Sequence, residues 1–119
     1  MRQLLPNEIR ERLLQNGRLR ESFQLEGKCE PDFFPVVKLF AGSSCTWLLT
    51  ELDPEDEDIA FGLCDLGMGF PELGSVSIKE IETSCRQLRV LVEIDQHFDP
   101  RKTISEYAAE ARRRGRIED

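Results

Sequence analysis

The sequence predicts an α+β fold in which an antiparallel sheet of about four to five strands packs with an N-terminal, a short middle and a C-terminal helix. Three strand-like segments follow one another between residues 34 and 65, an order that favours antiparallel pairing over a βαβ repeat. Helical patterns lie at both ends, and two Ser/Thr-x-x-Glu sequences predict helix starts in the second half. The 119 residues suit one domain, which we expect to comprise residues 1–119.

The first predicted helix begins at Asn7, which is a suitable N-cap residue. Apolar residues recur every four positions, at Leu5, Ile9 and Leu13, as on one face of a helix. Asn16-Gly17 is typical of a helix end, because glycine readily adopts the left-handed conformation that stops a helix. We therefore expect residues 18–32 to form an irregular connector.

Three strands are predicted next, at residues 34–40, 46–52 and 59–65. All three segments are rich in aromatic, β-branched or aliphatic residues. The second and third are separated by residues 53–58, an acidic stretch whose like charges favour exposure to water. These two strands should form a hairpin with an acidic turn.

A short strand is expected at residues 73–77, and Ser77 with Glu80 resembles the capping box of a helix that runs to about Cys85. Residues 90–98 alternate between apolar and polar side chains, as on a half-buried strand. Thr103 and Glu106 form a second capping-box sequence. It begins a helix that has one apolar side, formed by Tyr107, Ala108 and Ala111, and that ends near Gly115.

One core is expected to hold the apolar side chains of several strands. Trp47 lies in the middle of a predicted strand beside leucines, so core packing is favoured over an exposed binding role. The residues predicted to share this core are Phe40, Trp47, Leu49, Val92 and Ile94.

The chain is acidic, with a formal net charge of −7 and 33% charged residues. Residues 39–85 hold ten acidic side chains and one basic side chain, Lys79, and therefore a net charge of −9. This field disfavours direct binding to nucleic acid or to an anionic membrane, because it repels phosphate. Arginines gather near the C-terminus, where a solvated helix end is favoured over contact with phosphate; they are Arg112, Arg113, Arg114 and Arg116.

Neither a membrane-spanning run nor a signal peptide is recognisable, so we expect a cytoplasmic protein. The four cysteines, Cys29, Cys45, Cys64 and Cys85, are widely spaced and include no C-x-x-C pair. We expect four reduced thiols, no zinc site and no cofactor.

The acidic stretch is the first candidate site, as a surface for an unidentified protein partner. Its proposed binding residues are Asp53, Glu55, Asp56, Glu57 and Asp58. Carboxylates at alternate positions also occur in calcium loops, but the glycine and the bidentate glutamate of such loops are missing. A solvated hairpin turn is the alternative without a function.

The second candidate site is a group of three residues, Asp95, His97 and Asp99, on one face of the strand predicted at residues 90–98. Carboxylates with an imidazole could hold a metal ion, or an aspartate could orient His97 as a general base. Glu93, with Glu51 or Glu72 from strands expected nearby, could complete an oxygen-rich metal site. A solvated or hydrogen-bonded histidine is the structural alternative.

Long motifs occur in order along nearly the whole chain: Leu5–Arg10, Pro35–Phe40, Thr46–Asp53, Ile59–Gly67, Phe70–Gly74 and a late Glu93-x-Asp95-x-x-Phe98. Together they resemble a family of small bacterial proteins known only as a domain of unknown function. The resemblance implies occurrence on plasmids, phages and conjugative elements, but it implies no activity and no catalytic residue. Two positions differ from the usual family pattern: Ser75 replaces an aromatic residue, and Ile94 replaces an arginine.

Two classes of function follow. The first is a non-enzymatic accessory protein of a mobile genetic element that acts by protein–protein contact, in one form as an antirestriction protein or DNA mimic. The alternative is a metal-dependent hydrolase or nuclease-like module built on Glu93, Asp95, His97 and Asp99.

Overall fold

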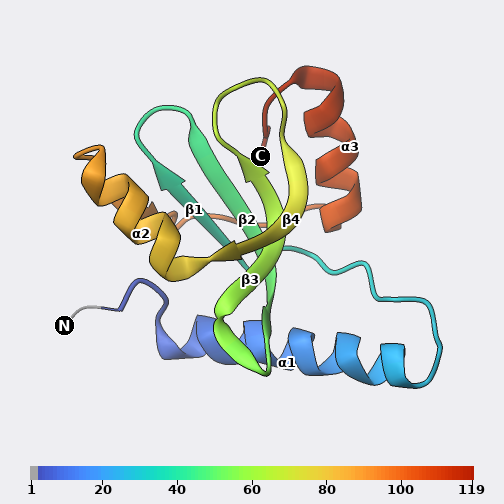
Figure 1. The fold of residues 1–119 in the computed structure, drawn as a ribbon. Coiled ribbons are helices and arrows are strands. Elements are labelled where there is room, and N and C mark those ends of the chain that lie inside the picture. The colour runs from blue at the N-terminus through green and yellow to red at the C-terminus, as the bar shows by residue number, and fades with distance from the viewer. Residues whose placement is uncertain (1–2) are drawn as a thin grey trace.

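The computed structural model describes residues 3–119 and contains one antiparallel sheet with strand order β4-β3-β2-β1-β5 (Figure 1). This confirms the α+β fold with N-terminal, middle and C-terminal helices. The elements in chain order are α1 (Asn7–Leu25), β1 (Val37–Ala41), β2 (Cys45–Asp53), β3 (Asp56–Asp65), β4 (Glu72–Ser77), α2 (Ile78–Gln87), β5 (Val92–Ile94) and α3 (Ile104–Arg114).

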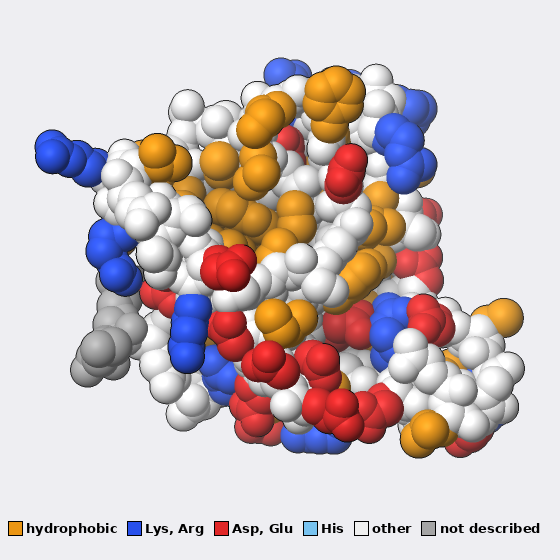
Figure 2. All heavy atoms as spheres, viewed as in Figure 1, with side chains coloured by type: hydrophobic (Ala, Val, Ile, Leu, Met, Phe, Trp, Pro, Cys, Tyr) orange, Lys and Arg blue, Asp and Glu red, His pale blue; other side chains and the backbone are white. Residues whose placement is uncertain are grey.

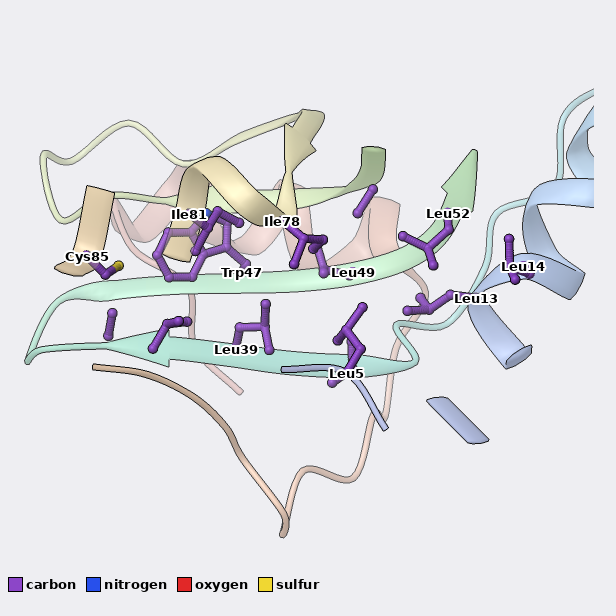
Figure 3. Packing of buried hydrophobic residues seen from close by; sticks show 14 residues of the cluster. Leu5, Leu13, Leu14, Leu39, Trp47, Leu49, Leu52, Ile78, Ile81 and Cys85 are labelled. Carbon is purple, nitrogen blue, oxygen red and sulfur yellow. The ribbon is translucent and has the colours of Figure 1, made fainter. Parts of the chain in front are cut away.

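The sheet has an apolar cluster on each face. The larger cluster lies between the sheet, α2 and the N-terminal half of α1, and Figure 3 shows Trp47 of β2 packed beneath Ile81 of α2. The smaller cluster joins Leu48 and Leu63 to α3. Trp47 is 4% exposed, which confirms that it belongs to the core. Of the five residues predicted to share that core, Phe40 is absent from the larger cluster, because strand alternation turns it to the opposite face from Leu39.

Helix α1 is longer than the sequence predicts. It begins after Pro6 rather than with Asn7 as the cap, and it continues through Gly17 to Leu25. Gly17 is buried because the helix meets β2 there: a Cβ atom at Gly17 would lie 1.9 Å from the carbonyl oxygen of Leu52. The glycine therefore permits close packing and does not end the helix, so the predicted connector 18–32 is wrong over residues 18–25.

The predicted β2–β3 hairpin is confirmed, with its turn at Pro54 and Glu55. The first strand is shorter than expected, since β1 begins at Val37. The strand predicted at residues 90–98 is also mostly wrong, because β5 ends at Ile94.

Both predicted middle and C-terminal helices are confirmed, and each receives an additional cap from a distant aspartate. Asp58 accepts hydrogen bonds from the hydroxyl of Ser77 and, at 2.9 Å, from the backbone N–H of Lys79 at the start of α2. Asp32 accepts a 3.1 Å bond from the backbone N–H of Ser105 at the start of α3. These carboxylates fix both helices to the sheet and to the segment after α1.

Helix α3 ends as predicted at Gly115, whose φ of 75° provides the left-handed stop. Asp65, at the end of β3, accepts bonds from the N–H groups of Gly67 and Ile117, at 2.8 and 3.0 Å. One buried carboxylate thus holds both the β3–β4 loop and the segment after α3.

All four cysteines are free thiols, as expected: Cys85 is buried, Cys45 and Cys64 are half-buried, and Cys29 is exposed. Burial raises the pKa of the Cys64 thiol to about 11, so this thiol stays protonated at neutral pH. Among residues 3–119, no helix combines the length and apolarity needed to cross a bilayer.

Candidate binding groove

The pairing of β2 with β3 is interrupted by a bulge between Leu49 and Glu51. An extra residue in one strand reverses the alternation of the side chains that follow it. Leu52 therefore joins the larger apolar cluster, and Glu51 lies opposite Phe61 on the other face of the sheet. The bulge places a buried carboxylate, 6% exposed, on the sheet face that also carries α3.

Arg20 of α1 binds this carboxylate. Its Nε donates a 2.5 Å hydrogen bond to Glu51, and its other nitrogens reach Glu30 at 2.8 Å and the carbonyl oxygen of Pro31 at 3.2 Å. The guanidinium also lies between two aromatic rings, 5.5 Å from the centroid of Phe33 and 5.7 Å from that of Phe61. Arg20 thus joins α1, the connector and the sheet.

Neighbouring groups satisfy the remaining polar atoms of the bulge. The side-chain amide of Asn16 donates to the carbonyl oxygen of Thr50 at 2.8 Å, and the Thr50 hydroxyl lies 3.1 Å from a Glu51 oxygen. No buried side-chain nitrogen or oxygen within residues 3–119 lacks a hydrogen-bond partner. The bulge is therefore a stable feature that holds Glu51 in place.

The carboxylates alter the protonation equilibria around Arg20. Burial would lower the pKa of Arg20, but the hydrogen bond and charge of Glu51, together with Glu30, outweigh it and raise that pKa. A hydrogen bond from Gln24 and the charge of Arg20 lower the pKa of Glu30, despite some desolvation. Arg20 and Glu30 are therefore both charged at neutral pH.

A groove of about 480 Å³ opens beside this ion pair, between α1, the β2–β3 turn and β4. Arg20 is the one basic residue that lines it, against five carboxylates: Glu21, Glu30, Glu51, Asp53 and Glu55. We call this feature the acidic groove. Figure 2 shows acidic side chains gathered in the lower part of the view, around the β2–β3 turn.

The five carboxylates of the predicted acidic site differ in what they contact. Asp53 and Asp56 each accept a backbone N–H within the turn, from Glu55 and Asp58, at 2.9 and 3.2 Å. Glu57 pairs with Arg10 of α1 at 3.2 Å, and Asp58 caps α2. The Glu55 side chain makes no such contact within the described residues. Among these five, only Asp53 and Glu55 line the acidic groove.

The other predicted site is arranged differently from the expectation. Asp95 and His97 lie in a turn after β5, where the Asp95 carboxylate accepts the backbone N–H of His97 at 2.9 Å. Asp95 also lies 3.6 Å from Lys38, and Asp99 pairs with Arg101 at 3.3 Å. The three residues therefore do not alternate along one strand face, as the sequence suggested.

The carboxylates expected to assist that site lie elsewhere. Glu72 is on β4, the edge strand opposite β5, and Glu51 is on β2 with β1 between it and β5. Among residues 3–119, no group of three or more histidine, cysteine, aspartate or glutamate side chains is arranged to hold a metal ion.

Sequence reasoning misses Arg20, because the sequence predicts an irregular connector at residues 18–32, whereas α1 continues to Leu25. It names Glu51 only as a possible additional ligand of the metal site around His97, and not as the partner of an arginine. One signal was available: Glu51 lies in the run Trp47–Leu52, which is otherwise almost entirely apolar. A carboxylate in a buried strand requires a cationic partner, and Arg20 occupies the inner side of a helix that sequence reasoning ended too early.

The fold and the groove together define a small α+β protein with an acidic groove beside its sheet. The chain belongs to the family described as "Protein of unknown function (DUF2958)", whose family model matches residues 4–118. This confirms membership of an uncharacterised family over almost the whole chain. Neither a search of curated proteins nor a search of solved structures found a match.

Proposed function

We propose that this chain is a cytoplasmic, non-enzymatic accessory protein of a bacterial mobile genetic element, and that it acts by binding a protein partner through the acidic groove. The observation that carries the proposal is the charge of the groove, where five carboxylates surround a single arginine. That arginine is already engaged by Glu51 and Glu30. The remaining carboxylates favour a partner surface rich in lysine or arginine.

The groove suits side chains of a macromolecule better than an enclosed small ligand. Sites for small molecules are usually concave and mostly apolar, whereas six of the residues that line this groove are charged, some of them on its exposed rim. Glu21 and Glu55 lie on that rim and are exposed. Charges in such positions mainly increase the rate of association and its dependence on salt.

A partner that itself binds DNA is a narrower form of this proposal, because surface carboxylates can take the place of phosphates. In this form, duplex DNA and the chain would compete for the same partner surface. Competition by duplex DNA in the binding assay described next would support it, and simultaneous binding would contradict it.

The proposal can be tested by pull-down from a bacterial host that carries the element. The groove variant combines Glu21→Gln with Glu55→Gln. The matched control combines Glu11→Gln with Glu93→Gln, which makes the same change in net charge at exposed positions outside the groove. A specific partner should be retained at low salt by the parent and the control, and about tenfold less by the groove variant.

Retention of the same partner by all three proteins would contradict a role for the groove. If no protein is retained even at low salt, where attraction between charges is strongest, the contact model is wrong.

A further inference from the structure

We propose that the partner binds as an extended segment that adds a strand to the outer edge of β4 and places a basic side chain in the acidic groove. This inference rests on the proposed function, because it specifies how the partner reaches that groove. Strand addition to a sheet edge is a recurring mode of recognition, in which backbone hydrogen bonds provide affinity and side-chain pockets provide specificity.

The outer edge of β4 is free to pair. β4 is a terminal strand of the sheet and is bonded only to β3. Among the described residues, no backbone group of Leu73–Val76 forms a further backbone hydrogen bond on the outer side. Figure 2 shows the strand crossing the face of the molecule uncovered, with apolar side chains on both sides.

Two hollows lie along β4, one beside Leu73 and one beside Ser75, and these two residues are two positions apart on the strand. Leu73 and Ser75 point to the same face of the sheet, because they are two residues apart on the strand. They pair with Leu63 and Phe61 of β3, on the face that carries α3. Ser75 lines the acidic groove. Leu73 lines a second hollow of about 610 Å³; the other residues that line it are Gly69, Phe70, Pro71, Glu72 and Arg112.

The spacing matches what a bound strand presents. Side chains two residues apart on an extended peptide lie on one face, roughly 7 Å apart. A segment paired with β4 would therefore place one side chain over Leu73 and the next over Ser75. Phe70 is 79% exposed and Leu73 is 40% exposed, so the first position favours an apolar side chain. The carboxylates of the acidic groove favour lysine or arginine at the second.

Electrostatic repulsion disfavours a second copy of this chain as the molecule that pairs with the outer edge of β4. Two copies paired through β4 would bring their acidic grooves close together, and like charges in such an arrangement repel. The opposite edge strand, β5, is a poorer site because it is only three residues long. The observations thus favour a basic, extended segment of another protein.

The probe is an acetylated and amidated octapeptide with threonine at odd positions and leucine and arginine alternating at even positions. One control peptide has glutamate in place of arginine, and another carries a methyl group on every backbone amide nitrogen. The first control removes charge complementarity, and the second prevents backbone pairing. Binding is measured by calorimetry at low salt, and hydrogen exchange reports protection of the amides of Leu73–Val76.

The informative variant is Ser75→Lys, which should place its own ammonium group in the acidic groove. Its matched control is Ser84→Lys, the same change at an exposed position of α2. We expect the arginine peptide to protect β4 amides and to bind at least tenfold more tightly than either control peptide. Ser75→Lys should weaken that binding about tenfold, while Ser84→Lys should not.

Each other outcome has a definite meaning. If the methylated peptide binds as tightly as the arginine peptide and the β4 amides are not protected, strand addition is wrong and the acidic groove remains the binding surface. If the glutamate peptide binds equally through β4, the charge-based proposed function is wrong and the edge remains a docking site. If no peptide binds at millimolar concentration, or the chain sediments as a dimer paired through β4, this inference is overturned.

Discussion

Arg20 and Glu51 show how one residue pair can connect distant parts of the chain. Their side chains are 18% and 8% exposed, the most buried ion pair among the described residues. Glu51 needs Arg20 as a partner, because an unpaired carboxylate in this position would be poorly solvated. Both residues of the pair also line the acidic groove.

We expect Arg20→Met to destabilise the protein by about 1–3 kcal/mol, because Glu51 loses its partner while the aliphatic part of the side chain is retained. Adding Glu51→Gln should recover part of that loss, with a coupling energy of about 1–2 kcal/mol. Urea unfolding of the parent, both single variants and the double variant measures the coupling.

The matched control for this cycle is Arg10→Met, which breaks the more exposed pair with Glu57. It should change the free energy of unfolding by no more than about 0.5 kcal/mol. Strictly additive effects of Arg20→Met and Glu51→Gln would show that the contact contributes nothing to stability.

At the scale of elements, the acidic turn is part of the framework as well as a surface. Asp58 links the hairpin to α2, Asp32 links the connector to α3, and Asp65 links β3 to the segment after α3. The small sheet is thereby connected to its helices by carboxylates as well as by apolar packing. A charge run that looks like a binding surface in the sequence thus includes residues with structural roles.

Removing the Asp58 cap should cost stability although the residue lies in an acidic cluster. We expect Asp58→Ala to lower the free energy of unfolding by about 1 kcal/mol, the usual value for a lost helix cap. Neutralising its neighbours with Glu55→Gln, Asp56→Asn and Glu57→Gln should change stability by only a few tenths of a kcal/mol, because less repulsion offsets the lost ion pair. Thermal and urea unfolding compare Asp58→Ala with the triple variant. If both lose the same free energy of unfolding, the assignment of Asp58 as a cap is contradicted.

Gly17 provides a test of how α1 meets the sheet. Alanine normally stabilises a helix interior by about 1 kcal/mol relative to glycine. Here its Cβ would lie 1.9 Å from the carbonyl oxygen of Leu52, so α1 would have to move. We expect Gly17→Ala to destabilise the protein by about 1–3 kcal/mol in urea unfolding. Gly74→Ala, where a Cβ has no atom within 4 Å, is the control. If Gly17→Ala instead stabilises the protein, α1 lies farther from the Leu52 carbonyl oxygen than the structure indicates.

For the whole molecule, local signals in the sequence were sufficient for most of the fold. Element types and their order were predicted by the capping sequences at Ser77 and Thr103 and by the aromatic, β-branched and aliphatic content of the three central strands. The groove could not be predicted, because it depends on two tertiary features. Close packing at Gly17 lets α1 continue to Arg20, and the bulge at Thr50 turns Glu51 toward it. Neither feature has a periodic signal, and glycine in a helix resembles a helix end until its neighbour is known.

The helix caps also predict how the molecule responds to acid. Burial would raise the pKa values of Asp32 and Asp58, but hydrogen bonds from Ser105 and from Ser77 and Lys79 outweigh it, so both pKa values are lowered. As pH falls, the unfolded chain therefore binds protons first, near its ordinary aspartate pKa of about 3.9. The stability that these groups contribute is complete above about pH 5 and decreases as pH falls through their folded-state pKa values.

Replacing both carboxylates, with Asp32→Asn and Asp58→Asn, should thus lower stability at pH 7 by about 1 kcal/mol in total, because asparagine keeps a hydrogen-bond acceptor but lacks the negative charge that favours a helix N-terminus. The difference from the parent should shrink as pH decreases from 5 to about 2.5, because the parent loses the same interactions by protonation. Urea unfolding across this pH range measures the effect. The control is the double variant Glu11→Gln and Glu93→Gln, whose free energy of unfolding should change with pH as steeply as that of the parent. A constant difference at all pH values would mean that the aspartates stabilise the helices through geometry alone and not through their charge.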